Sequence, residues 1–226
     1  MPSTATDLDF VTTDGAQFTL RSPSLIVAGY TGREESSVQA HIEELAAIGV
    51  PPPETVPAFY TLESDLLTTC AEVEVAGTNT SGEAEPVILR HSGAYYLTVG
   101  SDHTDRDVER SSVADSKAAC PKPLGHEVAP LSGPPSSWPW DALMISSNVD
   151  GAPYQHASLA SIRQPADLLL RLEEVVGSVE GDMVLYTGTV PLLSGGFVPG
   201  RDWQLSLELS PTTTLTHRYV TTIRSI

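Results

Sequence analysis

The sequence EPVILRHSGAYYLTVGS, residues 85–101, consists of two β-branched and aromatic runs separated by a turn at Ser92-Gly93. Runs of this kind, bounded by glycine, serine or asparagine, are typical of β-strands. Similar segments lie on both sides: DLDFVTT (7–13), QFTLRS (17–22), SLIVAG (24–29), VPAFYTL (56–62), CAEVEVAG (70–77), ALMISSN (142–148), DMVLYTG (182–188), DWQLSLEL (202–209) and HRYVTTI (217–223). The 18 prolines and 17 glycines favour many turns. We therefore expect a mainly β (α+β) protein with a few short helices.

Two segments are predicted to be helical. The first covers residues 36–48, with a serine cap, an apolar stripe of Val38, Ile42 and Leu45, and a stop at Gly49 before three prolines. The second covers residues 165–176, from Pro165 to the residue before Gly177. Residues 121–139, rich in proline, glycine and serine, are expected to form a loop. We expect residues 1–55 to form a small hairpin and helix that contribute to the site, and residues 56–226 to form the β core.

Composition limits the classes of function. Twelve basic against 29 acidic residues give a formal charge of −17, which repels phosphate backbones and disfavours a nucleic-acid partner. Two cysteines are too few for a disulfide framework. No apolar run reaches the ~18 residues expected of a membrane span, and the polar start is not that of a signal peptide. We expect a cytoplasmic protein that makes no membrane contact.

Four charged residues stand out in order along the chain. Glu72 and Glu74 are two apart on a predicted strand and so project to the same side, and Asp102 and Lys117 follow. Three carboxylates could hold a divalent cation, with the lysine beside whatever that cation activates. The alternative is that the two glutamates belong to a solvated strand face and that Lys117 is a surface residue paired with a nearby aspartate.

Several short motifs, none of them specific alone, occur in one order across residues 70–202. They are Glu72-Val-Glu74, Ser101 to Asp107, Lys117 to Gly125, Asn148 to Gly151 with Gln155, Gly181-Asp182 leading to Thr187-Gly188-Thr189, and Pro199-Gly200. In this order they resemble the fumarylacetoacetate hydrolase superfamily, and within it the DUF2848 branch. The resemblance implies a β-roll or sandwich like the C-terminal domain of fumarylacetoacetate hydrolase, and a homodimer.

The resemblance also implies roles for individual residues. Glu72, Glu74 and Asp102 would be the ligands of Mg²⁺ or Mn²⁺, with Ca²⁺ also possible. His41 and Glu44, neighbours at i and i+3 on the first helix, match a dyad that activates water, although a histidine packed at a helix edge explains the pattern equally well. The resemblance assigns Lys117 to oxyanion stabilisation, and Arg106 and Asp107 to a clamp that orients Asp102. The residues assigned to the substrate pocket are Tyr60, Asn148, Gln155, Thr187, Gly188 and Thr189.

These roles point to a metal-dependent hydrolase that cleaves a carbon–carbon bond in an acylpyruvate-like or 1,3-dicarbonyl small molecule through an enolate held by the metal. A first alternative is a lyase on the same scaffold, a 2-oxo-acid decarboxylase or hydratase, which needs no water-activating dyad. A second alternative is a non-catalytic acidic protein that binds metal, which predicts no dependence on Lys117. Because one fold hosts several chemistries, the sequence leaves the substrate open.

Overall fold

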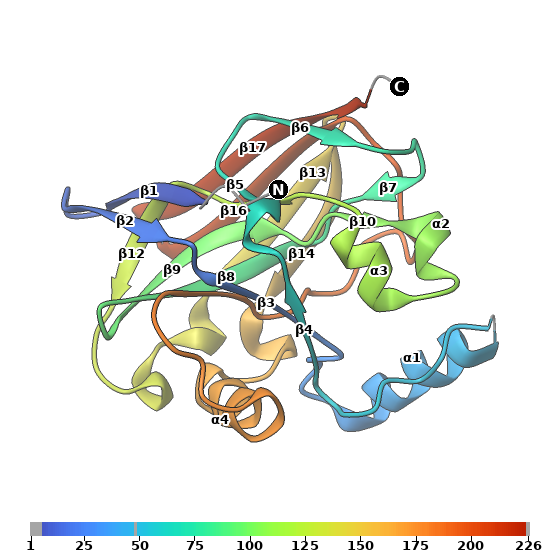
Figure 1. Ribbon diagram of the computed structural model, residues 1–226, viewed down its shortest axis with the longest axis horizontal. Coiled ribbons are helices and arrows are strands. Elements are labelled where there is room, and N and C mark those ends of the chain that lie inside the picture. The colour runs from blue at the N-terminus through green and yellow to red at the C-terminus, as the bar shows by residue number, and fades with distance from the viewer. Residues whose placement is uncertain (1–5, 48, 225–226) are drawn as a thin grey trace.

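A computed structural model describes residues 6–47 and 49–224 of the chain, which form a predominantly β fold (Figure 1). The larger sheet has eight strands, in the order β2 (Gln17–Arg21), β1 (Asp7–Thr12), β12 (Glu127–Leu131), β9 (Ala94–Ser101), β8 (Ala84–His91), β15 (Met183–Tyr186), β3 (Ser24–Gly29) and β4 (Ala58–Leu62). The smaller sheet has five strands, in the order β14 (Ala152–Ser158), β13 (Met144–Val149), β16 (Asp202–Ser210), β17 (Thr213–Ile223) and β6 (Glu72–Val75). The expected mainly β class is confirmed.

Short elements connect the sheets. Two small strand pairs are β10 (Thr104–Asp105) with β7 (Thr80–Ser81), and β11 (Lys122–Pro123) with β5 (Leu67–Thr68). The α-helices are α1 (Glu35–Ala47), α2 (Arg106–Glu109), α3 (Val113–Ala118) and α4 (Pro165–Val176). Single 3₁₀ turns are η1 (Ser64–Leu66), η2 (Pro135–Ser137), η3 (Trp140–Ala142) and η4 (Leu159–Ser161). Among the described residues, no helix is long and apolar enough to cross a membrane.

The main hydrophobic core lies between the two sheets. Ile88 and Leu97 of the larger sheet belong to the same buried cluster as Trp203 and Leu205 of the smaller one. Burial of such side chains stabilises the fold by about 1.5–3 kcal/mol each, so the sandwich follows from the alternating apolar residues of the strands. The helix α4 covers part of this core with Leu168 and its neighbours.

The larger sheet is buried on both faces. Val87 and Leu89 of β8 point away from the first core and join a second cluster that includes Leu124. This explains why residues 86–89 read as a continuous apolar run rather than as an alternation. A strand held on both faces is a rigid support for polar residues at its ends.

The structure contains elements that the sequence analysis did not predict, among them the helices α2 and α3. The strand β12 lies within the predicted loop at 121–139, because residues 127–131 pair with β9 on one side and β1 on the other. The division into residues 1–55 and 56–226 stays a prediction; the strands β3 and β4, one on each side of residue 55, are hydrogen-bonded neighbours in one sheet. The N-terminal strands therefore complete the same sheet that contains β8 and β9.

Candidate active site

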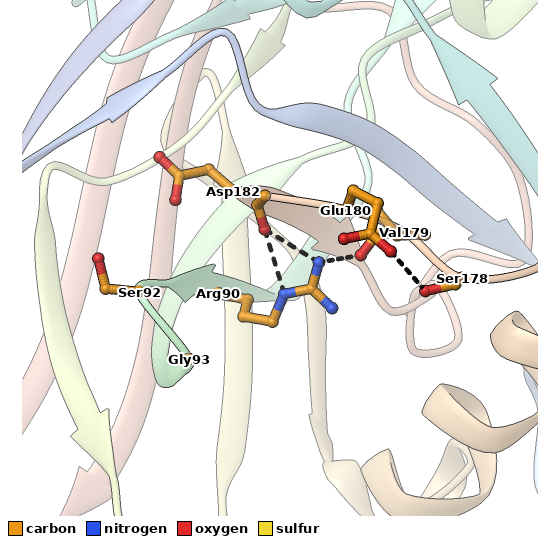
Figure 2. Close-up of a pocket in the computed structure, with 8 residues that line it drawn as sticks. Arg90, Ser92, Gly93, Ser178, Val179, Glu180 and Asp182 are labelled. Carbon is orange, nitrogen blue, oxygen red and sulfur yellow. Dashed lines mark hydrogen bonds between the residues drawn. The ribbon is translucent and has the colours of Figure 1, made fainter.

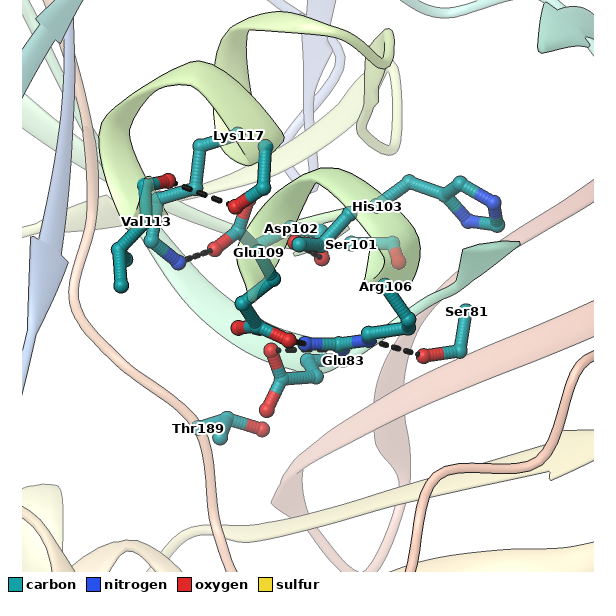
Figure 3. Close-up of polar contacts among 12 residues, drawn as sticks. Ser81, Glu83, Ser101, Asp102, His103, Arg106, Glu109, Val113, Lys117 and Thr189 are labelled. Atoms are coloured by element: carbon teal, nitrogen blue, oxygen red, sulfur yellow. Dashed lines mark hydrogen bonds and ion pairs between the residues drawn. The ribbon is translucent and has the colours of Figure 1, made fainter. Parts of the chain in front are cut away.

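Three carboxylates meet at one end of the β8–β9 hairpin. Glu85 is opposite Gly100, and the backbone N–H of Asp102 donates to the carbonyl of Glu83 at 3.0 Å. Residues two apart on a strand point the same way, so Glu83 and Glu85 face one side of the hairpin end. Figure 3 shows Glu83 and Asp102 beneath the two short helices α2 and α3, close to Lys117 and Arg106.

Asp102 is the centre of this cluster and is fully buried. Its Oδ2 accepts a hydrogen bond from the Lys117 ammonium, and the Nζ of Lys122 lies 3.2 Å from its Oδ1. Within the described part of the chain, Oδ1 accepts no hydrogen bond, so the contact with Lys122 is an ion pair alone. Burial raises the pKa of Asp102, but the two ammonium groups outweigh it and hold the pKa at about 2. Asp102 is therefore ionised at neutral pH.

Lys117 comes from the last turn of α3, whose first turn is capped by the Ser112 side chain at 3.1 Å from the N–H of Asp115. The lysine side chain points inward and is buried. Burial disfavours its charge, yet Asp102 and the two nearby glutamates together raise the pKa of Lys117. The structure thus places Lys117 in the cluster and not on the surface beside Asp105 or Asp115.

Lys122 is fully buried on the other side of Asp102. Its Nζ donates to the carbonyls of His103 at 2.7 Å and Cys120 at 3.2 Å, and also to that of Lys117. Its own backbone is fixed by the β11–β5 pair and by the hydroxyl of Tyr186, which donates to the Lys122 carbonyl at 2.9 Å. Burial lowers the pKa of Lys122, and the attraction of Asp102 opposes this shift.

The two glutamates are held differently. The Oε2 of Glu85 accepts from the N–H of Gly188 at 2.8 Å, and burial, followed by the charge of Asp102, raises the pKa of Glu85 well above its usual range. Glu83 pairs with the Arg106 guanidinium at 3.1 Å. Arg106 also contacts Glu109 at 2.9 Å; burial disfavours its charge, but the two glutamates outweigh burial and raise the pKa of Arg106.

Aromatic rings lie beside these charges. The Tyr60 ring centroid is 5.7 Å from the Nζ of Lys117, and burial raises the pKa of the Tyr60 hydroxyl to about 12. The Phe197 ring lies over the Arg106 guanidinium, with 3.4 Å between the ring centroid and Cζ, and is 42% exposed. Tyr60, predicted to contact substrate, is thus next to Lys117, while Phe197 was not anticipated.

The predicted pocket residues of the Thr187-Gly188-Thr189 segment support β8. The hydroxyl of Thr187 donates to the Pro86 carbonyl at 2.8 Å, and that of Thr189 donates to the Ala84 carbonyl at 3.0 Å. A Cβ on Gly188 would lie 1.7 Å from Thr31 Oγ1, and its φ of +98° also requires glycine. The segment therefore packs tightly against the strand that presents Glu85.

Gln155 belongs to the same network. Its Oε1 accepts from the N–H of Ala84 at 2.8 Å, and its Nε2 donates to Thr189 Oγ1 at 2.6 Å. Asn148, the other predicted floor residue, is half-buried on β13 opposite Gln204. Gln155 thus holds the start of β8 in place through these hydrogen bonds.

The predicted pairing of Glu72 and Glu74 with Asp102 is corrected. Both glutamates lie on the edge strand β6, where Val73 and Val75 face the core and the two carboxylates are exposed. Glu74 is 3.8 Å from the exposed Arg224. A strand with one buried face must turn its alternate residues to solvent. Glu72 and Glu74 therefore belong to a solvated strand face, which was the alternative to the metal site.

Two further predictions have different outcomes. The expected clamp on Asp102 is wrong, because Arg106 pairs with Glu83 and Glu109, while Asp107 accepts a hydrogen bond from Asn79 at 2.7 Å. In the predicted dyad, Glu44 is exposed on α1, and the side chain of His41 lies outside the described residues. The dyad stays a prediction.

The chemistry of the three carboxylates suits a hard divalent cation, which prefers oxygen ligands. Asp102 Oδ1, buried and without a hydrogen bond, is the kind of atom that a ligand would satisfy. No group of three His, Cys, Asp or Glu side chains in residues 6–47 and 49–224 has the arrangement of a metal site. The Lys117 ammonium is bound to Asp102 and is attracted by both Glu83 and Glu85.

A hollow of about 480 Å³ lies away from this cluster, at the opposite end of β8 (Figure 2). It is bordered by Arg90, whose guanidinium donates to the carbonyls of Val179 and Gly181. Nearby Asp182 is paired with His91 at 2.9 Å. The Arg90 guanidinium is already hydrogen-bonded to the loop before β15, and Asp182 is already paired with His91. This hollow therefore offers no cluster of charged groups like the one around Asp102.

Comparison with known proteins supports the fold. The family model described as "Protein of unknown function (DUF2848)" matches residues 28–219. A search of curated proteins gave no match.

Solved structures with similar folds include three enzymes. Fumarylpyruvate hydrolase from Pseudomonas aeruginosa, in complex with Mn²⁺ and pyruvate, is 18% identical with a TM-score of 0.65, covering 99% of this chain and 98% of that one. The 5-carboxymethyl-2-hydroxymuconate delta-isomerase from Mycobacterium smegmatis is 16% identical with a TM-score of 0.59, covering 94% and 87%. A 2-keto-3-deoxy-D-arabinonate dehydratase in its apo form is 17% identical with a TM-score of 0.59, covering 90% and 74%.

Proposed function

The chain belongs to the DUF2848 family and has the fold of the fumarylacetoacetate hydrolase proteins, and from this premise we propose that it is a divalent-metal-dependent hydrolase. Its substrate would be a small acylpyruvate-like or other 1,3-dicarbonyl compound in which a carbon–carbon bond is cleaved. The observation that carries the proposal is the buried Lys117–Asp102 pair beside Glu83 and Glu85. Buried charge of this density is costly for folding and is typical of functional sites.

Glu83, Glu85 and Asp102 would hold the cation, in place of the set that includes Glu72 and Glu74. Mg²⁺ and Mn²⁺ are the preferred ions, with Ca²⁺ as an alternative. When bound, the ion would supply positive charge to two oxygens of an oxo acid or dicarbonyl. All three carboxylates come from the rigid end of one hairpin, which favours precise placement.

Lys117 would stabilise the negative charge that develops on a substrate oxygen when the carbon–carbon bond breaks. Its ammonium is fixed by Asp102 and flanked by the Tyr60 ring, so it acts in a site with little water. Fixed charges in such a site stabilise transition states more strongly than charges in water do. This role predicts a loss of turnover on removal of Lys117.

The lyase alternative is favoured by one observation. Both ring nitrogens of His103, the histidine next to Asp102, are bonded, to Tyr219 and to Thr80 at 2.9 Å each. Burial, reinforced by Lys122, lowers the pKa of His103 to about 3, so this ring is not a base for water. With His103 excluded, the predicted His41–Glu44 dyad would be the base for hydrolysis, whereas decarboxylation or hydration would need no such dyad. Loss of rate in His41→Ala with metal binding retained would favour the hydrolase.

Two further properties are proposed from the resemblance, namely a homodimer and a cytoplasmic location. Light scattering of the purified chain tests the first, and a monomeric mass would contradict it.

The decisive experiment compares the two E-x-E sequences. We expect a screen of 2-oxo and 1,3-dicarbonyl compounds with Mg²⁺ or Mn²⁺ to identify a substrate through loss of its ultraviolet enol absorbance. The double variant Glu83→Gln/Glu85→Gln should lose both turnover and Mn²⁺ binding. The matched double variant Glu72→Gln/Glu74→Gln removes the same charge and should keep both. The opposite pattern would sink the proposed site, and activity without any divalent cation would sink the metal dependence.

A further inference from the structure

The chain contains two lysines, Lys117 and Lys122, and both contact the carboxylate of Asp102. The other ten of its twelve basic residues are arginines. Both lysine side chains of the protein, each a compact ammonium on a flexible stem, are thus used at one place, beside the two carboxylate oxygens of one buried aspartate. This concentration calls for a role for the second lysine, which the proposed reaction does not use.

The two lysines are held in different ways. Lys117 is bound through its ammonium to Asp102. The ammonium of Lys122 is bound by three backbone carbonyls, those of His103, Lys117 and Cys120, as well as lying 3.2 Å from Asp102 Oδ1. An ammonium has three donors, and the carbonyls take all of them. Lys122 is therefore fixed in place by the backbone, independently of Asp102.

We propose that Lys122 is a positioning residue that acts as a countercharge held beside Asp102 and weakens the hold of the site on a divalent cation. This inference rests on the proposed function, because it assumes that Asp102 is a cation ligand. A fixed positive charge beside a ligand oxygen repels a bound cation, and burial leaves little water to screen the repulsion. The consequence is a site that binds its cation loosely enough to exchange it.

The direction of the effect separates this role from simple support of the fold. Removing the Lys122 charge removes the repulsion and leaves Asp102 Oδ1 in need of a cation, and both changes tighten cation binding. Damage to the local structure would weaken binding instead. A gain in affinity is thus a result that a structural lysine does not produce.

The test measures Mn²⁺ binding by electron paramagnetic resonance, in which free Mn²⁺ gives a signal that bound Mn²⁺ loses. We expect Lys122→Gln, which keeps two donors for the carbonyls, to bind Mn²⁺ at least about tenfold more tightly than wild type. The gain should disappear in Lys122→Gln/Asp102→Asn. Arg218→Gln is the matched control, since it removes one positive charge from an exposed ion pair with Asp202 and should leave affinity within about twofold.

Unchanged or weaker Mn²⁺ binding by folded Lys122→Gln would overturn the inference, as would a gain that persists without the Asp102 carboxylate. If wild type binds Mn²⁺ and Asp102→Asn does not, the metal part of the proposed function stands whatever Lys122→Gln shows. If wild type binds no Mn²⁺ at all, the metal part of the proposed function and this inference both fail.

A measurement on the wild-type chain covers the case in which Lys122→Gln does not fold. With ¹⁵N-labelled lysine, the protein has two side-chain ammonium groups to observe by nuclear magnetic resonance. The signal of Lys122, identified as the one that remains in Lys117→Met, should stay protected from solvent exchange from zero to saturating Mg²⁺. Loss of its protection at saturation would mean that the cation displaces Lys122, and the countercharge would be refuted.

Discussion

Replacing Lys117 by methionine tests how much the buried pair contributes to stability. Methionine keeps most of the stem and removes the charge. One charge-assisted hydrogen bond, worth about 1.5–3 kcal/mol, is lost from Asp102 Oδ2. Removal of one partner from an isolated buried pair costs about 3–5 kcal/mol, but Lys122 remains 3.2 Å from Oδ1 and keeps the carboxylate paired. We therefore expect Lys117→Met to lower the free energy of unfolding by about 2–3 kcal/mol.

Urea unfolding at pH 7, followed by fluorescence of the buried tryptophans, measures this loss. Arg218→Met is the matched control. Arg218 makes two hydrogen bonds to Asp202, at 2.9 and 2.6 Å, but its side chain is 65% exposed, so its removal should cost about 0.2–1 kcal/mol. Equal losses in the two variants would refute the claim that Lys117 is a buried partner of Asp102.

The remaining predictions concern catalysis, pH, backbone and salt. On an identified substrate, Lys117→Ala should lose turnover, and Lys117→Arg should recover little of it because a planar guanidinium group does not replace a compact ammonium. Wild-type turnover in both variants would contradict the catalytic role of Lys117. Asp102 has a pKa of about 2 in the folded chain against 3.8 when unfolded, so its ionised form contributes stability above pH ~4 that is lost as the pH falls toward 2. This contribution amounts to about 2 kcal/mol. In urea unfolding, the free energy of unfolding of Asp102→Asn should therefore vary less with pH than that of wild type. Gly188→Ala should lower the free energy of unfolding by more than about 2 kcal/mol. Gly15→Ala, at a φ of +90° but with nothing within 4 Å of the added Cβ, should lower it by about 1 kcal/mol. Similar losses for the two variants in urea unfolding would show that the contact with Thr31 is unimportant. With a net charge of −17, the melting temperature should rise between ~0.1 and ~1 M NaCl as the screening length falls, and a flat or falling melting temperature would show that surface repulsion is negligible.

Local signals in the sequence predicted most of the elements. The second helix begins at Pro165 and ends before Gly177, as its flanking residues indicate, and the strands at 85–93 and 95–101 pair as β8 and β9. The strand β12 was missed because its propensity is weak and its position depends on β1 and β9, which are distant in sequence. Tertiary pairing of this kind has no local signal.

The candidate site was predicted in part. Asp102 and Lys117 were identified, and the structure places them in contact. The glutamates were placed wrongly because the alternation at Glu72 and Glu74 shows only that one strand face is polar. Glu83-Ala84-Glu85 is also an E-x-E, and a signal for it existed: the turn at Ser92-Gly93 pairs residue 91 with 94 and residue 85 with 100. Continuing that register brings Glu83 opposite Asp102, as the backbone bond between them confirms.

Lys122 could not be found in this way. Its importance comes from three carbonyls that the sequence does not bring together and from burial that a charged residue rarely shows. The only sequence signal was the scarcity of lysine itself.

That scarcity makes the native chain unusually resistant to lysine-directed reagents. Acylating agents need an accessible, uncharged amine, and here both side-chain amines are buried and ion-paired. Modification of either lysine requires that the β8–β9 end opens. The rate of acylation of Lys117 and Lys122, measured by mass spectrometry, therefore reports how often this end of the hairpin opens. The measurement needs no engineered label.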